Sequence, residues 1–332
     1  MAEVQSTLRT RLGKNGPEVF PLALGTMGMS GIYGKTSEEE SIRTIQSAID
    51  RGINLIDTGD FYGMGENEML VGRAIRSRRN SVHISVKFGT LLGPNGMYLG
   101  FNAQPHLLKA FATYSLKRLG IEVIDIYRPA RLDPNVPIED TIGAIADLVK
   151  AGYVRYIGLS EVGPDTIRRA HAVHEIADLQ IEYSLISRGP EQKIFPVLRE
   201  LGIGATLYGV LSKGLLSGSK LNGNGDYRAL FPRFSPDHMK QNAAVVAPFL
   251  EFAKQRGQSA AQFALAWVFA KQPSFVPVVG ARTRAQLDEL LRVLQRPLSR
   301  AEVQEIETLV TPDAILGSRY PQAHMEQLDS EK

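Results

Sequence analysis

The chain has 332 residues, 43% of them hydrophobic, and a formal net charge of +3 from 38 lysines and arginines against 35 aspartates and glutamates. This length and apolar content suffice for one large α/β barrel or two smaller domains, and so small a charge surplus predicts no nucleic-acid partner. The absence of cysteine excludes disulfides, thiolate catalysis and cysteine-bound metal.

The sequence predicts neither a secretory signal nor a membrane span. No basic stretch followed by an apolar run occurs near the N-terminus. The longest apolar run, residues 263–270, is far shorter than the roughly 20 residues that a spanning helix needs, and it predicts a buried helix instead. We therefore expect a cytoplasmic protein without a membrane partner, and we expect a monomer.

Short β-rich runs alternate with longer amphipathic stretches along most of the chain. The expected strands, mostly apolar without alternation, span residues 22–24, 54–57, 83–86, 123–127, 156–159, 178–182, 204–208 and 275–279. The expected helices span residues 37–50, 66–77, 104–119, 138–150, 164–175, 190–200, 240–271 with a break near Gly257, and 283–294. Eight strand-then-helix units predict a (β/α)8 TIM barrel, expected to form a single domain over residues 1–332.

Two segments lie outside this repeat. Asn15-Gly16 stands between two short apolar runs, and this dipeptide favours a hairpin turn. We expect the resulting N-terminal β-hairpin to close the bottom of the barrel. Near the C-terminus, Ser299 and Glu302 form a capping-box pattern that predicts one extra helix, followed by a polar tail from about Gly317.

Two of the expected loops, residues 88–104 and 211–238, are long and rich in glycine. Each follows an expected strand, so each should lie at the C-terminal end of the barrel, where TIM barrels carry their active sites. Loops of this length in a compact domain are usually functional or mobile. Another glycine-rich segment, residues 25–31, lacks the spacing of a dinucleotide-binding turn and should border the substrate pocket.

Three side chains of chemical interest follow the second and third strands. Asp57 and Lys87 would lie at neighbouring strand ends, with Tyr62 in the loop above them. A buried lysine beside a tyrosine favours the phenolate and lowers the pKa of the phenol, while a carboxylate keeps the lysine charged. Such a tyrosine can donate a proton to a carbonyl oxygen as a hydride reaches the carbon. Taken singly, each residue could equally serve packing or a structural ion pair.

Two motifs make the combination more specific. Residues 58–63 read T-G-D-F-Y-G and are followed by G-E-N-E, and residues 125–134 read D-I-Y-R-P-A-R-L-D-P. Over almost its whole length the chain resembles the aldo-keto reductases, including the pyridoxal reductase and channel β-subunit branches. In that family the second motif usually reads D-L-Y-x-x-H-R-x-D-P. The match therefore departs from the family pattern at one functional position, Ala130.

The resemblance implies roles for individual residues. Tyr62, Lys87 and Asp57 correspond to the catalytic residues of the family, with Tyr62 as the general acid. Ala130 takes the place of a histidine that helps to orient and polarise the substrate carbonyl. Its small side chain widens the floor of the pocket, so we expect a preference for bulky ketones. Strand alternation would point Arg128 to the same side as Ala130, where it would fill part of that space or stabilise a developing oxyanion unless Pro129 distorts the strand. Alternatively, His106 or His238 reaches the site, or a neighbouring loop closes the gap.

The resemblance also implies NADPH as cofactor, with no metal ion. Ser160 and Gln180 would hold the nicotinamide carboxamide, and Tyr208 would stack on the ring. Glu161 stands where the family often has an asparagine. The full set of expected cofactor-binding residues is Ser160, Gln180, Tyr208, Leu211, Lys213, Gly214, Gly280, Arg282, Arg284 and Gln286.

The choice of NADPH rests on the segment after the eighth strand. Thr283 and Gln286 form a capping-box pattern, and a helix N-terminus offers free N–H groups and a positive dipole end to a phosphate. The flanking Arg282 and Arg284 suit bidentate contacts with the adenosine 2′-phosphate. Leu290 replaces an asparagine that often contacts the adenine in the family.

The leading interpretation is NADPH-dependent reduction of an aldehyde or a ketone to the alcohol. One alternative is a cofactor-sensing binding subunit with weak reductase activity, which the loss of the histidine at position 130 would favour. A second alternative is a Schiff-base lyase that uses Lys87. Oxidation of the cofactor by a carbonyl substrate would support the reductase, and borohydride trapping of a substrate on Lys87 would support the lyase.

Overall fold

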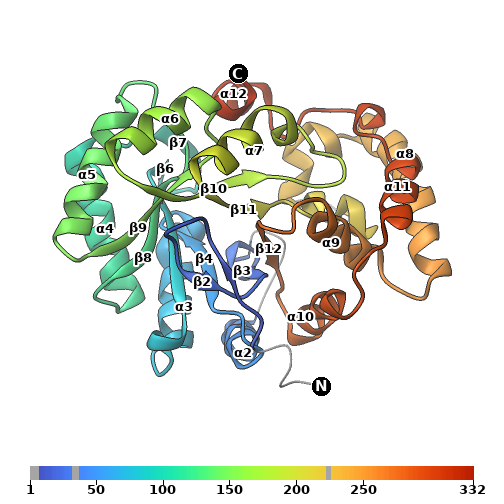
Figure 1. The fold of residues 1–332 in the computed structure, drawn as a ribbon, viewed down its shortest axis with the longest axis horizontal. Helices are drawn as coiled ribbons and strands as arrows, with labels where there is room; N and C mark the ends of the chain where they lie inside the picture. Colours follow the sequence, from blue (N-terminus) through green and yellow to red (C-terminus); the bar gives the residue numbers. More distant parts are fainter. Residues whose placement is uncertain (1–6, 32–36, 222–225) are drawn as a thin grey trace.

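The computed structural model describes residues 7–31, 37–221 and 226–332. Its centre is a closed barrel of eight parallel strands in the order β10-β11-β12-β3-β4-β5-β8-β9, with helices on the outside (Figure 1). The strands are β3 (Ala23–Gly25), β4 (Leu55–Gly59), β5 (His83–Phe88), β8 (Ile124–Pro129), β9 (Val154–Ser160), β10 (Ile176–Glu182), β11 (Gly204–Tyr208) and β12 (Val276–Gly280). The predicted TIM barrel is confirmed, and every strand boundary lies within two residues of its predicted position.

The outer layer consists of helices that alternate with the barrel strands along the chain. They are α2 (Glu38–Asp50), α3 (Glu66–Ile75), α4 (Pro105–Leu119), α5 (Ile138–Lys150), α6 (Pro164–Val173), α7 (Pro190–Leu201), α9 (Ala260–Lys271) and α10 (Arg284–Leu291). The predicted C-terminal helix is α11 (Arg300–Leu309), which contacts the additional helix α8 (Pro236–Gln255). None of the helices within the described ranges combines the length and the hydropathy that a transmembrane span requires.

The predicted break in helix 240–271 is confirmed at the boundary between α8 and α9. Gly257 adopts a left-handed φ of 67°, which a helix interior does not accommodate and which glycine tolerates without steric cost. Ser259 then begins α9 through a capping box with Gln262, in which each side chain bonds to the backbone N–H of the other.

The N-terminal hairpin closes the end of the barrel at which the strands begin. β1 (Thr10–Arg11) pairs antiparallel with β2 (Glu18–Val19), and the backbone N–H of Lys14 donates to the carbonyl of Gly202 at 2.7 Å. Leu12 is fully buried among the side chains of the barrel interior. The predicted hairpin and its position are therefore confirmed.

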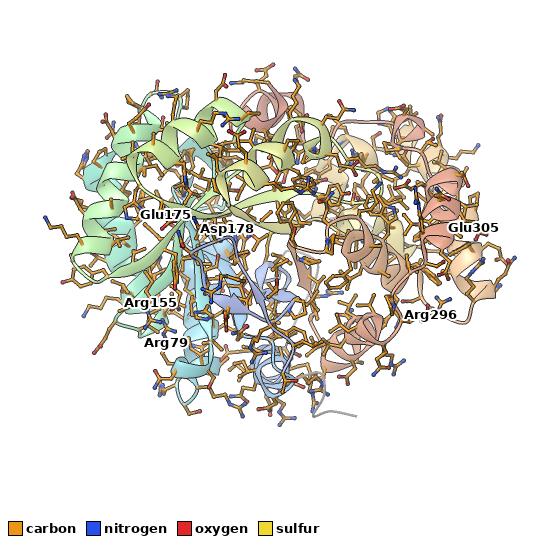
Figure 2. The ribbon with its side chains drawn as sticks, in the orientation of Figure 1. Arg79, Arg155, Glu175, Asp178, Arg296 and Glu305 are labelled. Atoms are coloured by element: carbon orange, nitrogen blue, oxygen red, sulfur yellow. The ribbon has the colours of Figure 1, made fainter. Side chains whose placement is uncertain are left out.

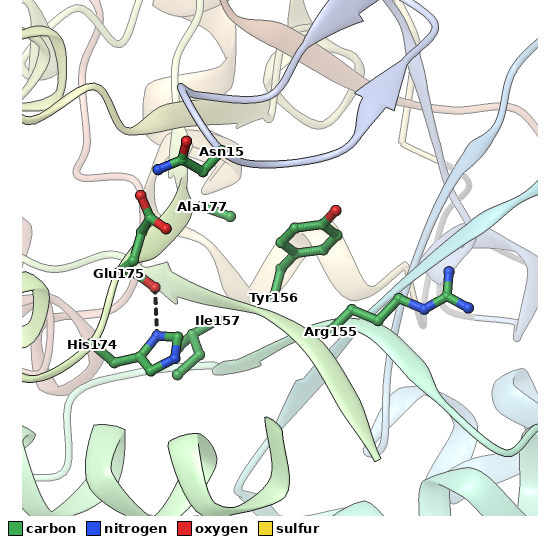
Figure 3. Close-up of a pocket in the computed structure, with 7 residues that line it drawn as sticks. All are labelled: Asn15, Arg155, Tyr156, Ile157, His174, Glu175 and Ala177. Atoms are coloured by element: carbon green, nitrogen blue, oxygen red, sulfur yellow. Dashed lines mark hydrogen bonds between the residues drawn. The ribbon is translucent and has the colours of Figure 1, made fainter. Parts of the chain in front are cut away.

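A cavity of ≈ 130 Å³ lies at this same end of the barrel (Figure 3). Asn15 of the hairpin, Tyr156 near the start of β9 and Ala177 near the start of β10 contribute to its lining. Because the predicted site residues follow the opposite ends of the strands, this cavity is not the candidate site.

Polar side chains occupy part of the barrel interior. Arg128 of β8 is fully buried and pairs with Asp178 of β10, labelled in Figure 2, with 2.9 Å between Nη1 and Oδ2. Its Nη2 donates to Ser85 Oγ at 2.9 Å. A Cβ atom at Gly158 would lie 2.9 Å from Asp178 Oδ1, so glycine leaves room for the pair. Of the two roles left open for Arg128, neither is free of this ion pair, because its guanidinium is bound to Asp178 and Ser85 inside the barrel.

Two segments expected to be irregular contain regular structure or specific contacts. The first long loop carries a hairpin formed by β6 (Thr90–Leu92) and β7 (Tyr98–Phe101). The expected polar tail includes the short helix α12 (Gln322–Met325), and Tyr98 Oη donates to Gln327 Oε1 at 2.8 Å. The C-terminal segment is thus attached to the hairpin. In the second long loop, residues 222–225 lie outside the described residues.

Candidate active site

Unusual backbone conformations mark one end of the barrel. Among the described residues, the non-glycine residues with positive φ are Met64, Glu161, Ser212 and Lys213, at 54°, 53°, 46° and 54°. Met64 follows β4, Glu161 follows β9, and the other two follow β11. Each such residue costs on the order of 1–3 kcal/mol and persists only where the surrounding structure enforces it. Their position at the C-terminal ends of the strands supports placing the active site there.

Asp57 and Lys87 form a buried ion pair at the ends of β4 and β5. Lys87 Nζ lies 2.5 Å from Asp57 Oδ2 and also donates to the carbonyl of Thr58 at 2.9 Å. Ser85 Oγ and Gln180 Nε2 donate to Asp57 Oδ1 at 3.0 and 2.9 Å. Burial lowers the pKa of Lys87, and the Asp57 carboxylate opposes that shift. The two residues that the sequence placed at neighbouring strand ends are therefore in direct contact.

Tyr62 lies beside this ion pair. Lys87 Nζ is 4.9 Å from the centre of the phenol ring, and Tyr62 is only 7% exposed. The tyrosine begins a short 3₁₀ helix, and the next three residues all have left-handed φ. A Cβ atom at the third of them, Gly65, would lie 2.8 Å from Arg118 Cδ. This turn separates β4 from α3 and keeps the phenol at the mouth of the barrel.

Asn67 ties the tyrosine loop to the barrel. It is fully buried near the start of α3, and its Oδ1 accepts hydrogen bonds from Thr26 Oγ1 at 2.6 Å and Thr58 Oγ1 at 2.7 Å. Its Nδ2 donates to the carbonyl of Thr26 at 2.9 Å and to Ser30 Oγ at 2.6 Å. Through Asn67, the G-E-N-E motif supplies a structural anchor for Tyr62.

Ala130 follows β8, and the arginine after it turns toward the mouth of the barrel. Ala130 is 2% exposed, and its N–H donates to the carbonyl of Phe88 at 2.9 Å. Arg131 donates from Nη1 to the Ala130 carbonyl at 2.6 Å, and its Cζ lies 5.6 Å from the ring centre of Tyr320. Position 130 therefore offers no imidazole, and a cation lies next to it.

Three predicted cofactor residues lie at the ends of the consecutive strands β9, β10 and β11. These residues are Ser160, Gln180 and Tyr208, and Gln180 pairs in register with Ser160. The hydrogen bond from Gln180 to Asp57 links this side of the site to the ion pair. Gly280 ends the next strand, β12, and is exposed. The fold brings these residues together, and their contacts with nicotinamide stay predictions.

Glu161 is held by the C-terminal segment. Arg319 Nη2 lies 2.7 Å from Glu161 Oε2, Ser330 Oγ donates to the same oxygen at 2.6 Å, and Tyr208 Oη donates to Oε1 at 2.7 Å. Burial alone would raise the pKa of Glu161, but the charges of Arg319 and Arg131 and the hydrogen bonds from Arg319 and Ser330 together outweigh burial, and the pKa falls to about 2. Tyr320 places its Oη 3.0 Å from Tyr208 Oη. Sequence reasoning missed Arg319 and Tyr320, because a polar tail without periodicity gives no signal of burial.

The loop after β11 forms a turn of left-handed residues. Ser212, Lys213 and Gly214 have φ values of 46°, 54° and 95°. A Cβ atom at Gly214 would lie 2.9 Å from Ser219 Cβ, so this position requires glycine. The N–H of Gly214 donates to the carbonyl of Leu211 at 2.9 Å. The predicted residues Leu211, Lys213 and Gly214 thus belong to one compact turn at the mouth.

The start of α10 already binds a carboxylate of the chain. Arg284 donates from its backbone N and its Nε to Oε1 of Glu40 in α2, and from Nη2 to Oε2, each at 3.2 Å. Thr283 caps the helix by accepting from the N–H of Gln286 at 3.3 Å, and Gln286 Oε1 accepts from the N–H of Arg282 at 2.9 Å. The predicted helix start is confirmed, and it accommodates an anionic group.

Comparison with known proteins identifies the family. The profile of the Aldo/keto reductase family matches residues 21–311. The chain belongs to this family. A relative from Glycine max, named probable aldo-keto reductase 1, is 38% identical over 317 residues, which cover 93% of this chain and 91% of the relative.

Two solved structures share the fold of this aldo-keto reductase. The glycerol dehydrogenase AKR11B4 from Gluconobacter oxydans has a TM-score of 0.81 at 28% identity, covering 92% of this chain and 96% of that chain. The aldo-keto reductase AKR11C1 from Bacillus halodurans, in its holo form, has a TM-score of 0.76 at 26% identity, covering 94% and 99%. Family membership makes the chain an oxidoreductase of carbonyl compounds that uses a nicotinamide cofactor.

Proposed function

We propose that this aldo-keto reductase reduces an aldehyde or a ketone with NADPH and uses Tyr62 as the general acid. The main support is the position of the Tyr62 ring beside Lys87. A buried ion pair with Asp57 holds Lys87 in this position. A panel of aldehydes and ketones, assayed with NADPH and with NADH, tests the proposal through oxidation of the cofactor. Oxidation by no carbonyl compound would contradict it, and borohydride trapping of a substrate on Lys87 would point to a lyase.

The chemistry follows from the placement of these side chains. When bound, NADPH supplies the hydride that reduces the carbonyl carbon. Tyr62 donates its proton to the carbonyl oxygen as negative charge develops there. The ammonium of Lys87 stabilises the phenolate that remains, and burial strengthens this attraction because the local dielectric is low. Asp57 keeps the ammonium charged and in place.

The residues after β12 fit a phosphate-bearing cofactor. Glu40 shows that an anionic group can accept three hydrogen bonds from Arg284 at the start of α10. The positive end of the helix dipole favours negative charge at the same place. Arg284 and Arg282 would hold the adenosine 2′-phosphate there, with Glu40 displaced.

Removing both arginines should separate the two cofactors. Arg282→Ala combined with Arg284→Ala should weaken NADPH binding by roughly 10–100-fold and leave NADH binding nearly unchanged, because only NADPH carries the phosphate. Glu40→Gln should tighten NADPH binding, because its carboxylate competes for Arg284. Fluorescence titration without substrate measures these affinities. Arg43→Ala, on the same helix as Glu40, is the matched control, and an equal loss for both cofactors would contradict the phosphate site.

The alanine at position 130 should set substrate size. We expect Ala130→His to raise turnover of small aldehydes, because an imidazole orients and polarises the carbonyl, and to lower turnover of bulky ketones, because it takes up volume. Position 130 is buried, so the added ring must project toward the substrate or displace Arg131. Kinetics with matched small and bulky substrates measure the effect. Parallel changes for both classes would show that Ala130 does not set this choice.

A further inference from the structure

Arg131 places a cation in the mouth of the barrel without a carboxylate in direct contact with it. Its Nη1 donates to the carbonyl of Ala130, and no carboxylate in the described part of the chain forms an ion pair with it within 4.0 Å, although Glu161 attracts it over a longer distance. A guanidinium carries five N–H donors in a planar fork, and this contact uses one nitrogen of it. The side chain is only partly exposed.

The two other cations near Tyr320, Arg319 and Lys213, already have assigned contacts. Arg319 Cζ lies 5.7 Å from the ring centre of Tyr320, but its guanidinium is paired with Glu161 and Glu182 at 2.7 and 3.2 Å. Lys213 Nζ lies 4.8 Å from the same ring and belongs to the turn assigned to the cofactor. Arg131, with Cζ 5.6 Å from the ring, has neither an ion pair among the described residues nor an assigned cofactor contact, so its guanidinium is available to bind an anion.

Arg131 also lies near the catalytic pair of Asp57 and Lys87. β8 pairs in parallel with β5, and Lys87 lies opposite Arg128, three residues before Arg131. The positive charge of Arg131 contributes to lowering the pKa of Lys87, after the larger effect of burial. An anion on Arg131 would therefore bind within the electrostatic reach of the group that activates Tyr62.

We infer that Arg131 binds a carboxylate of the substrate, so that the preferred substrates are carbonyl compounds that carry a carboxylate. The inference rests on the proposed reductase function. A planar carboxylate matches the guanidinium fork through two parallel hydrogen bonds, and partial burial strengthens them. Arg131 binds the remote anionic group in this scheme, while Tyr62 acts on the carbonyl. It is a specificity-determining residue.

Matched substrate pairs test this role. The pairs are para-carboxybenzaldehyde with its methyl ester, and succinic semialdehyde with butanal. In the native enzyme, kcat/KM should favour the carboxylate by roughly 10–100-fold, mainly through KM. Arg131→Met should abolish the preference by lowering kcat/KM for the carboxylates far more than for the methyl ester and butanal, and Arg131→Lys should retain part of it. Arg155→Met, at the opposite end of the barrel, is the control that should keep the full preference.

A binding measurement separates recognition from turnover. Benzoate should inhibit reduction of butanal competitively in the native enzyme and much more weakly in Arg131→Met, with NADPH affinity the same in both. Equal kcat/KM for the charged and uncharged members of each pair would overturn the inference, as would a preference for glycolaldehyde phosphate over both carboxylates. Arg131→Met losing activity on both members alike would also overturn it. If even the uncharged aldehydes are not reduced, the proposed function itself fails.

Discussion

Replacing Tyr62 with phenylalanine should lower kcat for carbonyl reduction by roughly 10²–10⁴-fold, the usual contribution of general acid catalysis. The change removes only the phenolic hydroxyl, so the edge-to-face contact with Phe61, at 4.8 Å between ring centres, should persist. The ion pair between Asp57 and Lys87 is held by its own hydrogen bonds and should also persist. Steady-state kinetics at saturating cofactor would measure the loss.

Two controls make this result specific to the proton donor. NADPH affinity of Tyr62→Phe should equal that of the native enzyme, because the hydroxyl acts on the substrate and not on the cofactor. Tyr114→Phe changes a 58% exposed tyrosine of α4 and should retain the native kcat. If Tyr62→Phe reduced carbonyls at the native rate, another group would have to supply the proton.

Arg128→Met should lower the free energy of unfolding by about 3–5 kcal/mol, because it leaves the buried Asp178 without its counter-ion. Burial raises the pKa of Asp178, and Arg128 opposes that shift, so the pKa should rise further in the variant. A carboxyl group whose pKa is higher in the folded than in the unfolded state makes the protein less stable as pH rises. The deficit should therefore be smallest in acid and grow as pH rises above the ordinary aspartate value near ~3.9. Urea unfolding at several pH values would measure it.

Matched variants separate the buried charge from a general loss of packing. Arg128→Met combined with Asp178→Asn should recover much of the lost stability, because no unpaired charge then remains inside the barrel. Arg168→Met removes an arginine whose partner, Glu200, is exposed, so its effect should be far smaller. If Arg128→Met were no more destabilising than Arg168→Met, the buried pair would not contribute to stability as argued.

The parts of the site that follow from strand order could be predicted from the sequence. Parallel strands bring their C-terminal ends together, so residues near the C-terminal ends of β4 and β5 had to lie close to each other. This reasoning places Asp57 beside Lys87, and the family resemblance adds Tyr62 above them. Local signals were also sufficient for the hairpin turn at Asn15-Gly16 and for the break near Gly257, because turn and cap preferences depend on a few adjacent residues.

Contacts between distant segments were decided by the tertiary structure alone. Arg319 meets Glu161 across 158 positions of the sequence, and Arg284 meets Glu40 across 244. No periodicity or motif links such pairs, since each depends on how the chain closes and on which polar group is left to pair when a charge is buried. The position of Arg128 likewise could not be predicted from the sequence alone. Strand alternation gave the side of the strand to which it points, but the buried carboxylate of Asp178 determined that it lies inside the barrel.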